Sequence, residues 1–251
     1  MNKSKRYYPL FRAIRKAVDI CYPKTEIAGY ENIPDEACVI IGNHAQLHGS
    51  IVCELYFPDK FYTWCAGEMM ELKEVPSYAY NDFWAQKPRI LRPFFRLLAC
   101  IIAPLSVVIF NNARTIGVYS DNRILSTFRE TVAKLSEGNN VVIFPEHNKE
   151  YNNIIYDFQD GFVDIARLYF KRTGKELSFV PLYIAPMLKK MCLGKPIKFS
   201  SDAPISDERR RICDYLMNEI SDIAGNLPEH TVVPYPNIPK KEYPTNKERM
   251  F

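Results

Sequence analysis

Residues that could carry acid–base chemistry gather in two short segments, each at the end of an apolar run. In residues 39–50 the run ends in Gly-Asn-His, which places His44 at its exit and His48 four residues later. In residues 141–149 a second run ends in Phe-Pro-Glu, which places Glu146 at its exit. Three of the four histidines of the chain lie in these two segments. Because imidazole titrates near neutral pH and these histidines are clustered rather than scattered, the pattern predicts a functional site in these two segments, with His44, His48 and Glu146 as candidate catalytic residues.

The spacing of apolar residues predicts helices and strands that alternate along the chain. Helical spacing extends over residues 124–135, 158–172 and 212–223, and short apolar runs predict strands between them. This alternation is typical of an α/β fold, here a single domain with a mostly parallel sheet flanked by helices. In such folds reactive groups stand at the ends of strands. The strands are predicted at residues 37–41, 107–110, 141–144, 179–184 and 197–199.

The first 24 residues form a basic amphipathic segment. Residues 1–25 carry seven Lys or Arg and one Asp, a net charge of +6, whereas the remaining 226 residues carry a net charge of −2. Basic charge confined to one end argues against nucleic-acid binding by the folded body. Leu10, Phe11, Ile14, Val18 and Cys21 share one helical face. The segment is therefore either a helix on an anionic membrane surface or an ordinary surface helix packed on the domain.

A second candidate for membrane contact lies at residues 92–96, where two arginines flank Pro-Phe-Phe. It leads into the apolar run 97–110, which contains a proline and is shorter than the roughly 20 residues that a spanning helix needs. The alternative is a buried helix that leads into a core strand. Seven scattered cysteines without a C-x-x-C pair indicate reduced thiols. We therefore expect a cytoplasmic protein that lies peripherally on the inner face of the cell membrane.

Composition also suggests the boundaries of the domain. We expect a basic N-terminal segment at residues 1–24, an α/β domain at residues 25–227, and an extended C-terminal tail at residues 228–251. The tail is predicted to be extended because it is rich in Pro, Lys and Asn.

Five short motifs between about residue 25 and residue 225 occur in an order that resembles the glycerolipid acyltransferases of the lysophosphatidic acid acyltransferase type, the PlsC-like family. Each motif is weak alone, and their order makes the resemblance specific. The motifs are a lead-in at residues 27–34, Asn43-His44 after an apolar strand, Phe144-Pro145-Glu146, the run 179–184, and the segment 193–205 before the last helix.

The resemblance implies an acyltransferase that moves a fatty acyl group from acyl-CoA or acyl carrier protein to a hydroxyl of a lysophospholipid or related lipid precursor. It implies that His44 is the general base that activates the hydroxyl and that Glu146 helps to hold the acceptor. The thioester is a substrate, and no cofactor is expected. The expected partners are the lipid acceptor, the acyl thioester, which acyl carrier protein could deliver, and an anionic membrane surface. Candidate substrate contacts are Asn43, Arg114, Arg123, Pro145, His147, Asn148 and Lys149, of which either arginine could bind an acceptor phosphate.

The chain departs from the family pattern at two places. Gly49 stands where the family's H-x4-D motif has the aspartate that orients the imidazole, and loss of such a carboxylate can cost several orders of magnitude in rate. His48 and Glu146 are the candidates to replace it. His-Asn-Lys149 follows Glu146 where the family has Gly-Thr-Arg, which argues against a glycerol 3-phosphate type of acceptor.

Two alternatives follow from the same residues. The first is a non-catalytic lipid- or acyl-binding protein that keeps the fold and has lost the chemistry together with the aspartate. The second is a metal-dependent hydrolase that uses His44, His48, Glu146 and His147, since two histidines four residues apart can share a metal on a helix. Gly49 and the strand exit argue against a helix at that point.

Overall fold

A computed structural model of the chain describes residues 8–58, 60–85, 87–150 and 152–248, without the side chains of Asn148 and Glu150. Three of the basic residues predicted to give the N-terminal segment its charge, Lys3, Lys5 and Arg6, lie outside the described residues. The chain forms two compact units. Unit 1 comprises Met1–Tyr22 and Thr63–Glu130, and unit 2 comprises Pro23–Tyr62 and Thr131–Phe251.

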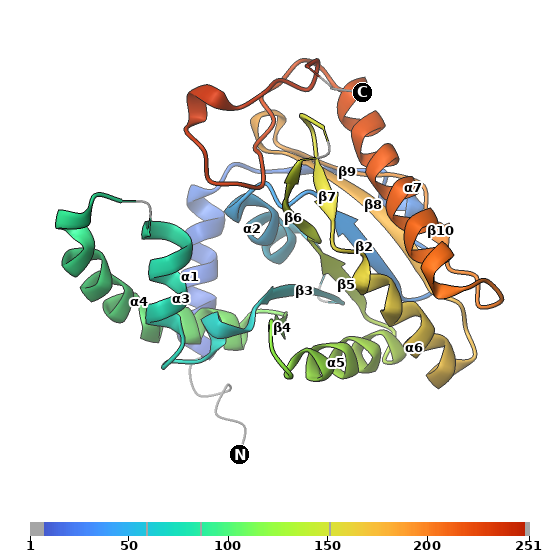
Figure 1. Ribbon diagram of the computed structural model, residues 1–251, viewed down its shortest axis with the longest axis horizontal. Coiled ribbons are helices and arrows are strands. Elements are labelled where there is room, and N and C mark those ends of the chain that lie inside the picture. Colours follow the sequence, from blue (N-terminus) through green and yellow to red (C-terminus); the bar gives the residue numbers. More distant parts are fainter. Residues whose placement is uncertain (1–7, 59, 86, 151, 249–251) are drawn as a thin grey trace. The chain divides into compact units, whose positions relative to one another are not determined.

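Unit 2 is built around a mixed, mostly parallel sheet in the order β1-β9-β8-β2-β5, with β10 beside β8 (Figure 1). Its central strand β2 pairs in parallel with β5 and β8, and β1 pairs in parallel with β9. β8 runs antiparallel to β9 and β10. The strands are β1 (Glu26–Ala28), β2 (Cys38–Gly42), β5 (Asn140–Ile143), β8 (Ser178–Ala185), β9 (Lys190–Leu193) and β10 (Ile197–Lys198).

Strand β2 is buried along its whole length, as are nearly all residues of β5 and β8. A parallel strand between two neighbours is covered on both faces, so it reads as a continuous apolar run rather than as alternation. This explains why the short apolar runs predicted these strands correctly. The α/β class and the mostly parallel sheet are confirmed.

The helices of unit 2 agree with the predictions in part. α7 (Ile205–Asn226) packs against β8 and buries Ile212, Leu216 and Ile220, as the helical spacing predicted. The helix predicted from residue 158 begins later, as α6 (Asp164–Thr173). The preceding residues form a short strand β7 (Tyr156–Phe158) and a 3-10 turn η6 (Asp160–Val163), because β7 pairs antiparallel with β6 (Glu146–Glu150). The remaining elements are α2 (Leu47–Tyr56) and the 3-10 turns η2 (Tyr30–Asn32), η7 (Pro186–Leu188) and η8 (Lys240–Glu242).

The C-terminal tail is anchored by buried polar side chains. His230 is 2% exposed, and its ring nitrogens lie 2.8 Å from the Tyr183 hydroxyl and 2.7 Å from the Pro228 carbonyl oxygen. The Asn246 side chain accepts the His230 N–H and donates to the Ala224 carbonyl at the end of α7. The tail has little regular structure, as predicted, but these contacts fix it to the sheet and to α7 rather than leaving it loosely on the surface.

Unit 1 is mainly helical, with one parallel strand pair, β3 (Phe61–Ala66) and β4 (Thr115–Val118). Its N-terminal helix α1 (Tyr8–Cys21) is amphipathic, as predicted. The strand predicted at residues 107–110 is wrong, because these residues are the last turns of the long helix α4 (Arg92–Asn112). The division between the units falls within β3 and within α5 (Ile124–Ser136). The shorter elements are η3 (Gly67–Met70), α3 (Val75–Ala79), the π-helical turn η4 (Tyr80–Trp84) and η5 (Arg89–Leu91).

The apolar run predicted to be too short to span a membrane belongs to a longer helical stretch. Among the described residues, the stretch Arg89–Asn112 is long and apolar enough to cross a bilayer, judged by length and composition. Only 17% of its most apolar window is buried within the protein. Its buried side chains are small, namely Ala99, Ala103 and Ser106.

Candidate functional site

The exit of strand β2 is fixed by Asn43. The Asn43 side-chain amide donates to the Ile184 carbonyl oxygen at 3.1 Å and accepts the Ile184 N–H at 2.7 Å. Just after the end of β2, this side chain therefore bonds to the backbone of β8 as a neighbouring strand would. Asn43 is 2% exposed, so both of these bonds are buried. The amide predicted to contact substrate is therefore engaged with the backbone of β8, and it sets the place at which His44 leaves the sheet.

The turn after His44 has an unusual backbone. Ala45 and Gln46 both have positive φ angles, 45° and 53°, which side-chain-bearing residues rarely adopt. Such conformations cost about 1–3 kcal/mol each and are concentrated at functional sites. The turn reverses the chain directly into α2, which begins at Leu47. The expectation that Gly49 lies outside a helix is therefore wrong, since Gly49 is the third residue of α2.

Glu146 binds the backbone of His44 rather than its imidazole. Its Oε2 accepts the His44 N–H at 2.5 Å, and its Oε1 accepts the N–H of Tyr156 on β7 at 3.0 Å. The side chain is 5% exposed, and this burial raises the pKa of Glu146 to about 7, although the two N–H donors oppose the shift. The carboxyl group thus joins the exits of the neighbouring parallel strands β2 and β5 and holds the His44 turn in place.

The imidazole of His44 is held by aromatic rings. Phe144 lies 5.4 Å away and Tyr235 lies 5.8 Å away between ring centroids, both in edge-on arrangements. The ring is half-buried, and its Nδ1 atom is buried without a hydrogen-bond partner among the described residues. Burial lowers the pKa of His44, and the backbone of Gln46 offsets this only in part. His44 is therefore a neutral base near pH 7.

The Phe144 ring lies beside Gly49, the position at which the H-x4-D motif has its aspartate. A Cβ atom added to Gly49 would lie 2.6 Å from the His44 carbonyl oxygen and 2.9 Å from Cζ of Phe144. A Cβ atom on Gly42 would lie 3.2 Å from the same ring. The two glycines make room for the phenyl ring, which occupies the space that a side chain at position 49 would need. His48, one of the two residues predicted to replace the aspartate, lies half-buried on α2, where burial and the charge of Lys240 lower its pKa.

The residues after Glu146 surround a different carboxylate. His147 Nε2 lies 3.5 Å and Lys149 Nζ lies 3.2 Å from Asp157 Oδ2 on β7. His147 and Asp157 also line a cavity of about 530 Å³, together with Arg209 of α7. Pro145 is buried, and the side chain of Asn148 lies outside the described part of the chain. The structure therefore unites Glu146 with His44 and groups His147 and Lys149 around Asp157.

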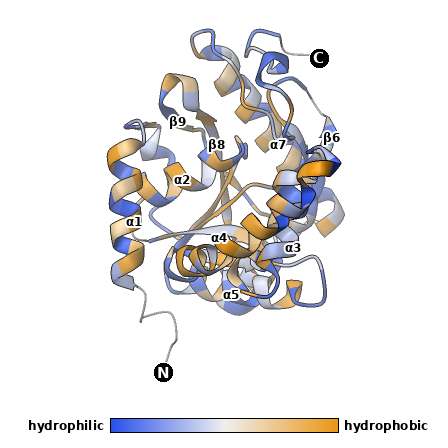
Figure 2. Ribbon diagram, turned by 90° about the vertical axis from the view of Figure 1, so that its left-hand side faces the viewer, coloured by the Kyte–Doolittle hydropathy of each residue, from blue (hydrophilic) through white to orange (hydrophobic). Residues whose placement is uncertain are grey.

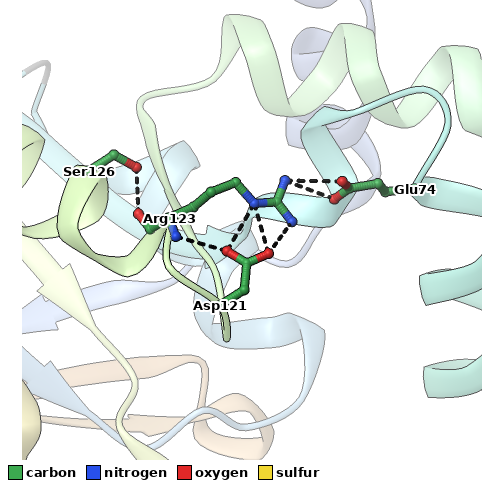
Figure 3. A network of polar contacts seen from close by, with 4 residues as sticks. All are labelled: Glu74, Asp121, Arg123 and Ser126. Carbon is green, nitrogen blue, oxygen red and sulfur yellow. Dashed lines mark hydrogen bonds and ion pairs between the residues drawn. The ribbon is translucent and has the colours of Figure 1, made fainter.

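The two arginines predicted to bind phosphate belong to unit 1, whereas His44 and Glu146 belong to unit 2. Figure 3 shows Arg123 between two carboxylates: Nη1 lies 3.0 Å from Glu74 and Nη2 lies 2.9 Å from Asp121. Its guanidinium carbon also lies 4.0 Å from the centre of the Tyr119 ring. These partners satisfy its donors, and the carboxylates raise the pKa of Arg123. Arg114 is half-buried, and a phosphate contact by either arginine stays a prediction.

The alternative of a metal-dependent hydrolase requires a cluster of metal-binding side chains. Among the residues that the structure describes, no group of three or more His, Cys, Asp or Glu side chains could hold a metal ion.

Sequence reasoning did not single out several residues of this site. Phe144 was noted only as part of a motif. In the structure its ring packs beside Gly42 of β2 and Gly49 of α2, and these two glycines are the sequence signal that a bulky side chain lies next to them. Tyr156 and Tyr235 carry no local signal, because the first acts through its backbone N–H and the second comes from the tail.

Comparisons with known proteins show a likeness to solved structures. No protein-family model matches the chain, and no curated protein matches its sequence. Among solved structures the chain is similar to the 1-acyl-sn-glycerophosphate (LPA) acyltransferase PlsC from Thermotoga maritima, with 13% sequence identity, 90% of this chain and 83% of that chain covered, and a TM-score of 0.49. The likeness concerns the path of the chain and says nothing of the site residues.

Proposed function

We propose that the protein is an acyltransferase that uses His44 to move a fatty acyl group from an acyl thioester to a hydroxyl of a lysophospholipid or related lipid precursor. The observation that supports this most directly is the hydrogen bond between the Glu146 carboxylate and the His44 N–H. It brings the two chemistry-bearing segments of the sequence together at the ends of adjacent parallel strands, where α/β proteins place reactive groups. The motif order supplies the choice of reaction class.

In the proposed reaction the neutral His44 ring removes the proton from the acceptor hydroxyl, whose oxygen attacks the thioester carbonyl carbon. The tetrahedral intermediate collapses with cleavage of the carbon–sulfur bond, and the imidazolium returns its proton to the leaving thiolate. The products are an ester and a free thiol, so no external reactant is needed. The lowered pKa of His44 keeps the ring in the neutral form that this step requires.

Glu146 acts in this proposal as a positioning residue. It holds the backbone of the His44 turn, and no carboxylate reaches the buried Nδ1 atom within the described residues. Loss of the carboxylate behind a catalytic histidine costs on the order of 10⁴-fold in rate where it has been isolated. We therefore expect slow turnover compared with a histidine that has an aspartate partner.

The test is mass spectrometry of the lipids formed when purified protein receives labelled acyl-CoA, or labelled acyl carrier protein, and a membrane lipid extract. The wild type should form a labelled lipid, and His44→Ala should abolish its formation while leaving the fold intact. Unchanged turnover in His44→Ala would overturn the assignment of the base.

A second candidate function is non-catalytic binding of an acyl thioester or lipid. It is favoured by the occupation of the aspartate position by the Phe144 ring. The same experiment separates the two. A wild-type protein that binds acyl-CoA in a calorimetric titration, but forms no labelled lipid with any acceptor, has the second function.

A further inference from the structure

Helix α4 has two opposite faces with different surroundings. Its small buried residues pack in one apolar cluster with Met69, Val75 and Ala79 of η3 and α3. Its opposite face carries large apolar side chains at intervals of three or four residues, which places them in one stripe. The stripe consists of Phe94, Leu97, Ile101 and Leu105, which are 61%, 61%, 65% and 47% exposed, and it is preceded by Ile90, which is 86% exposed.

Isolated exposed apolar side chains are ordinary, but a continuous stripe along a helix marks an interaction surface. In Figure 2 much of α4 has the colour of hydrophobic residues. Exposure of this much apolar surface to water is unfavourable, so we expect the stripe to bind an apolar partner.

The charged residues within this stretch of the sequence are all basic. Lys87, Arg89, Arg92 and Arg96 lie at its beginning, and the sequence contains no Asp or Glu between Asp82 and Asp121. Lys87 and Arg89 are exposed. Apolar side chains flanked by exposed basic ones match the boundary of an anionic bilayer, where head groups are negative and the layer beneath them is hydrocarbon.

We propose that α4 is an interfacial membrane-binding helix: its stripe enters the hydrocarbon boundary of an anionic lipid bilayer while the helix lies in the plane of the surface. The buried face supports this orientation over a spanning one. Ser106 Oγ donates to the Met69 carbonyl at 3.0 Å, and the small residues allow close packing against α3 and η3. A spanning α4 would have to give up these contacts. The inference does not rest on the proposed acyltransferase activity.

Helix α1, which contacts α4 within the same unit, adds to the surface in a smaller way. Its predicted apolar face is partly used in packing, since Phe11 is buried. Leu10, Val18 and Ile20 remain 48%, 36% and 74% exposed, and Arg12 and Lys16 are exposed as well. α1 therefore adds both apolar area and basic charge, and α4 supplies the longer apolar stripe.

The experiment is co-sedimentation of the full chain with vesicles of phosphatidylcholine alone or mixed with phosphatidylglycerol. The wild type should bind the mixed vesicles more tightly than the neutral ones. Phe94→Glu and Ile101→Glu should each weaken binding on the order of tenfold or more, because each removes apolar area from the stripe and adds repulsive charge. Lys87→Ala with Arg89→Ala should reduce the preference for phosphatidylglycerol without abolishing it, because Arg92 and Arg96 remain.

Leu125→Glu is the matched control, since Leu125 is 59% exposed, belongs to the same unit, and lies on α5 rather than on α4. It should bind vesicles like the wild type, and so should His44→Ala, which separates membrane binding from the proposed chemistry. Equal loss in Leu125→Glu and Ile101→Glu would overturn the proposal. So would wild-type vesicle binding by Ile101→Glu together with conversion of a dimer to a monomer in sedimentation velocity, which would assign the stripe to a second copy of the chain.

Discussion

Replacement of Gly49 by alanine measures how tightly the start of α2 is packed against the His44 turn. In an open helical position Gly→Ala stabilises a protein by about 0.5–1 kcal/mol. Here the new methyl group would lie 2.6 Å from a backbone oxygen and 2.9 Å from a phenyl carbon, both closer than real contacts allow. The phenyl ring of Phe144 can tilt, but the oxygen belongs to His44, whose backbone is held by Glu146.

Overpacking of this kind typically costs about 1–3 kcal/mol, which exceeds the helical gain. We expect a net loss of about 1–2 kcal/mol in the free energy of unfolding, which for a chain of this size is a fall of about 2–8 °C in Tm. Urea unfolding followed by circular dichroism gives the first value, and calorimetry gives the second.

The matched control is Gly225→Ala near the end of α7, where an added Cβ atom meets nothing within 4 Å. This variant should be as stable as the wild type or slightly more stable. If Gly49→Ala proved equally stable, the phenyl ring would not fill the aspartate position, and the account of the degenerate motif given above would fail.

Three further outcomes follow from the same site. Because burial raises the pKa of Glu146 from 4.5 to about 7, the folded protein keeps a proton that the unfolded chain loses, so the free energy of unfolding should fall by about 3 kcal/mol as pH rises from 4.5 to 7. Glu146→Gln should remove this slope in urea titrations, and a slope that persists would assign the effect to another group. Because burial lowers the pKa of His44 below 6.5, the acid limb of the kcat/KM profile should lie below pH 6.5, whereas a limb above it would indicate a carboxylate partner. Asn43→Asp should lower the free energy of unfolding by about 2 kcal/mol or more, since a buried carboxylate cannot donate to the Ile184 carbonyl, and a neutral result would contradict the clamp.

The central sheet could be predicted because each of its buried strands leaves a signal within a few neighbouring residues of the sequence. β2, β5 and β8 are covered on both faces, so their sequences are short uninterrupted apolar runs that few other structures produce. The four residues at 107–110 look the same locally, yet they end a helix of 21 residues. These residues are helical because they continue a helix whose small buried residues one and two turns earlier, Ala103 and Ala99, pack on α3. Ala99 and Ala103 lie outside the about four to eight residues from which a strand is predicted, so the prediction could not take them into account.

The candidate site was predictable in its members more than in its contacts. Adjacent parallel strands bring their exits together, so the proximity of His44 and Glu146 follows from topology. Whether a carboxylate then binds an imidazole or a backbone N–H depends on side-chain torsions that no sequence pattern fixes. The Tyr235 ring lies beside His44 because buried anchors such as His230 hold the tail, and this is a tertiary effect that spacing cannot reveal.

The geometry of the His44 turn leaves no room for an aspartate at position 49. A carboxylate at position 49 needs a Cβ atom where the Phe144 ring and the His44 carbonyl now lie. Replacing Phe144 by a smaller residue would relieve only the first contact, because the oxygen belongs to the backbone that Glu146 holds. An aspartate could enter only if the backbone at His44 moved as well. The imidazole in this chain therefore depends on desolvation and on aromatic packing for its orientation and its neutral state. We expect that Gly49→Asp alone does not give the His44 ring a carboxylate partner.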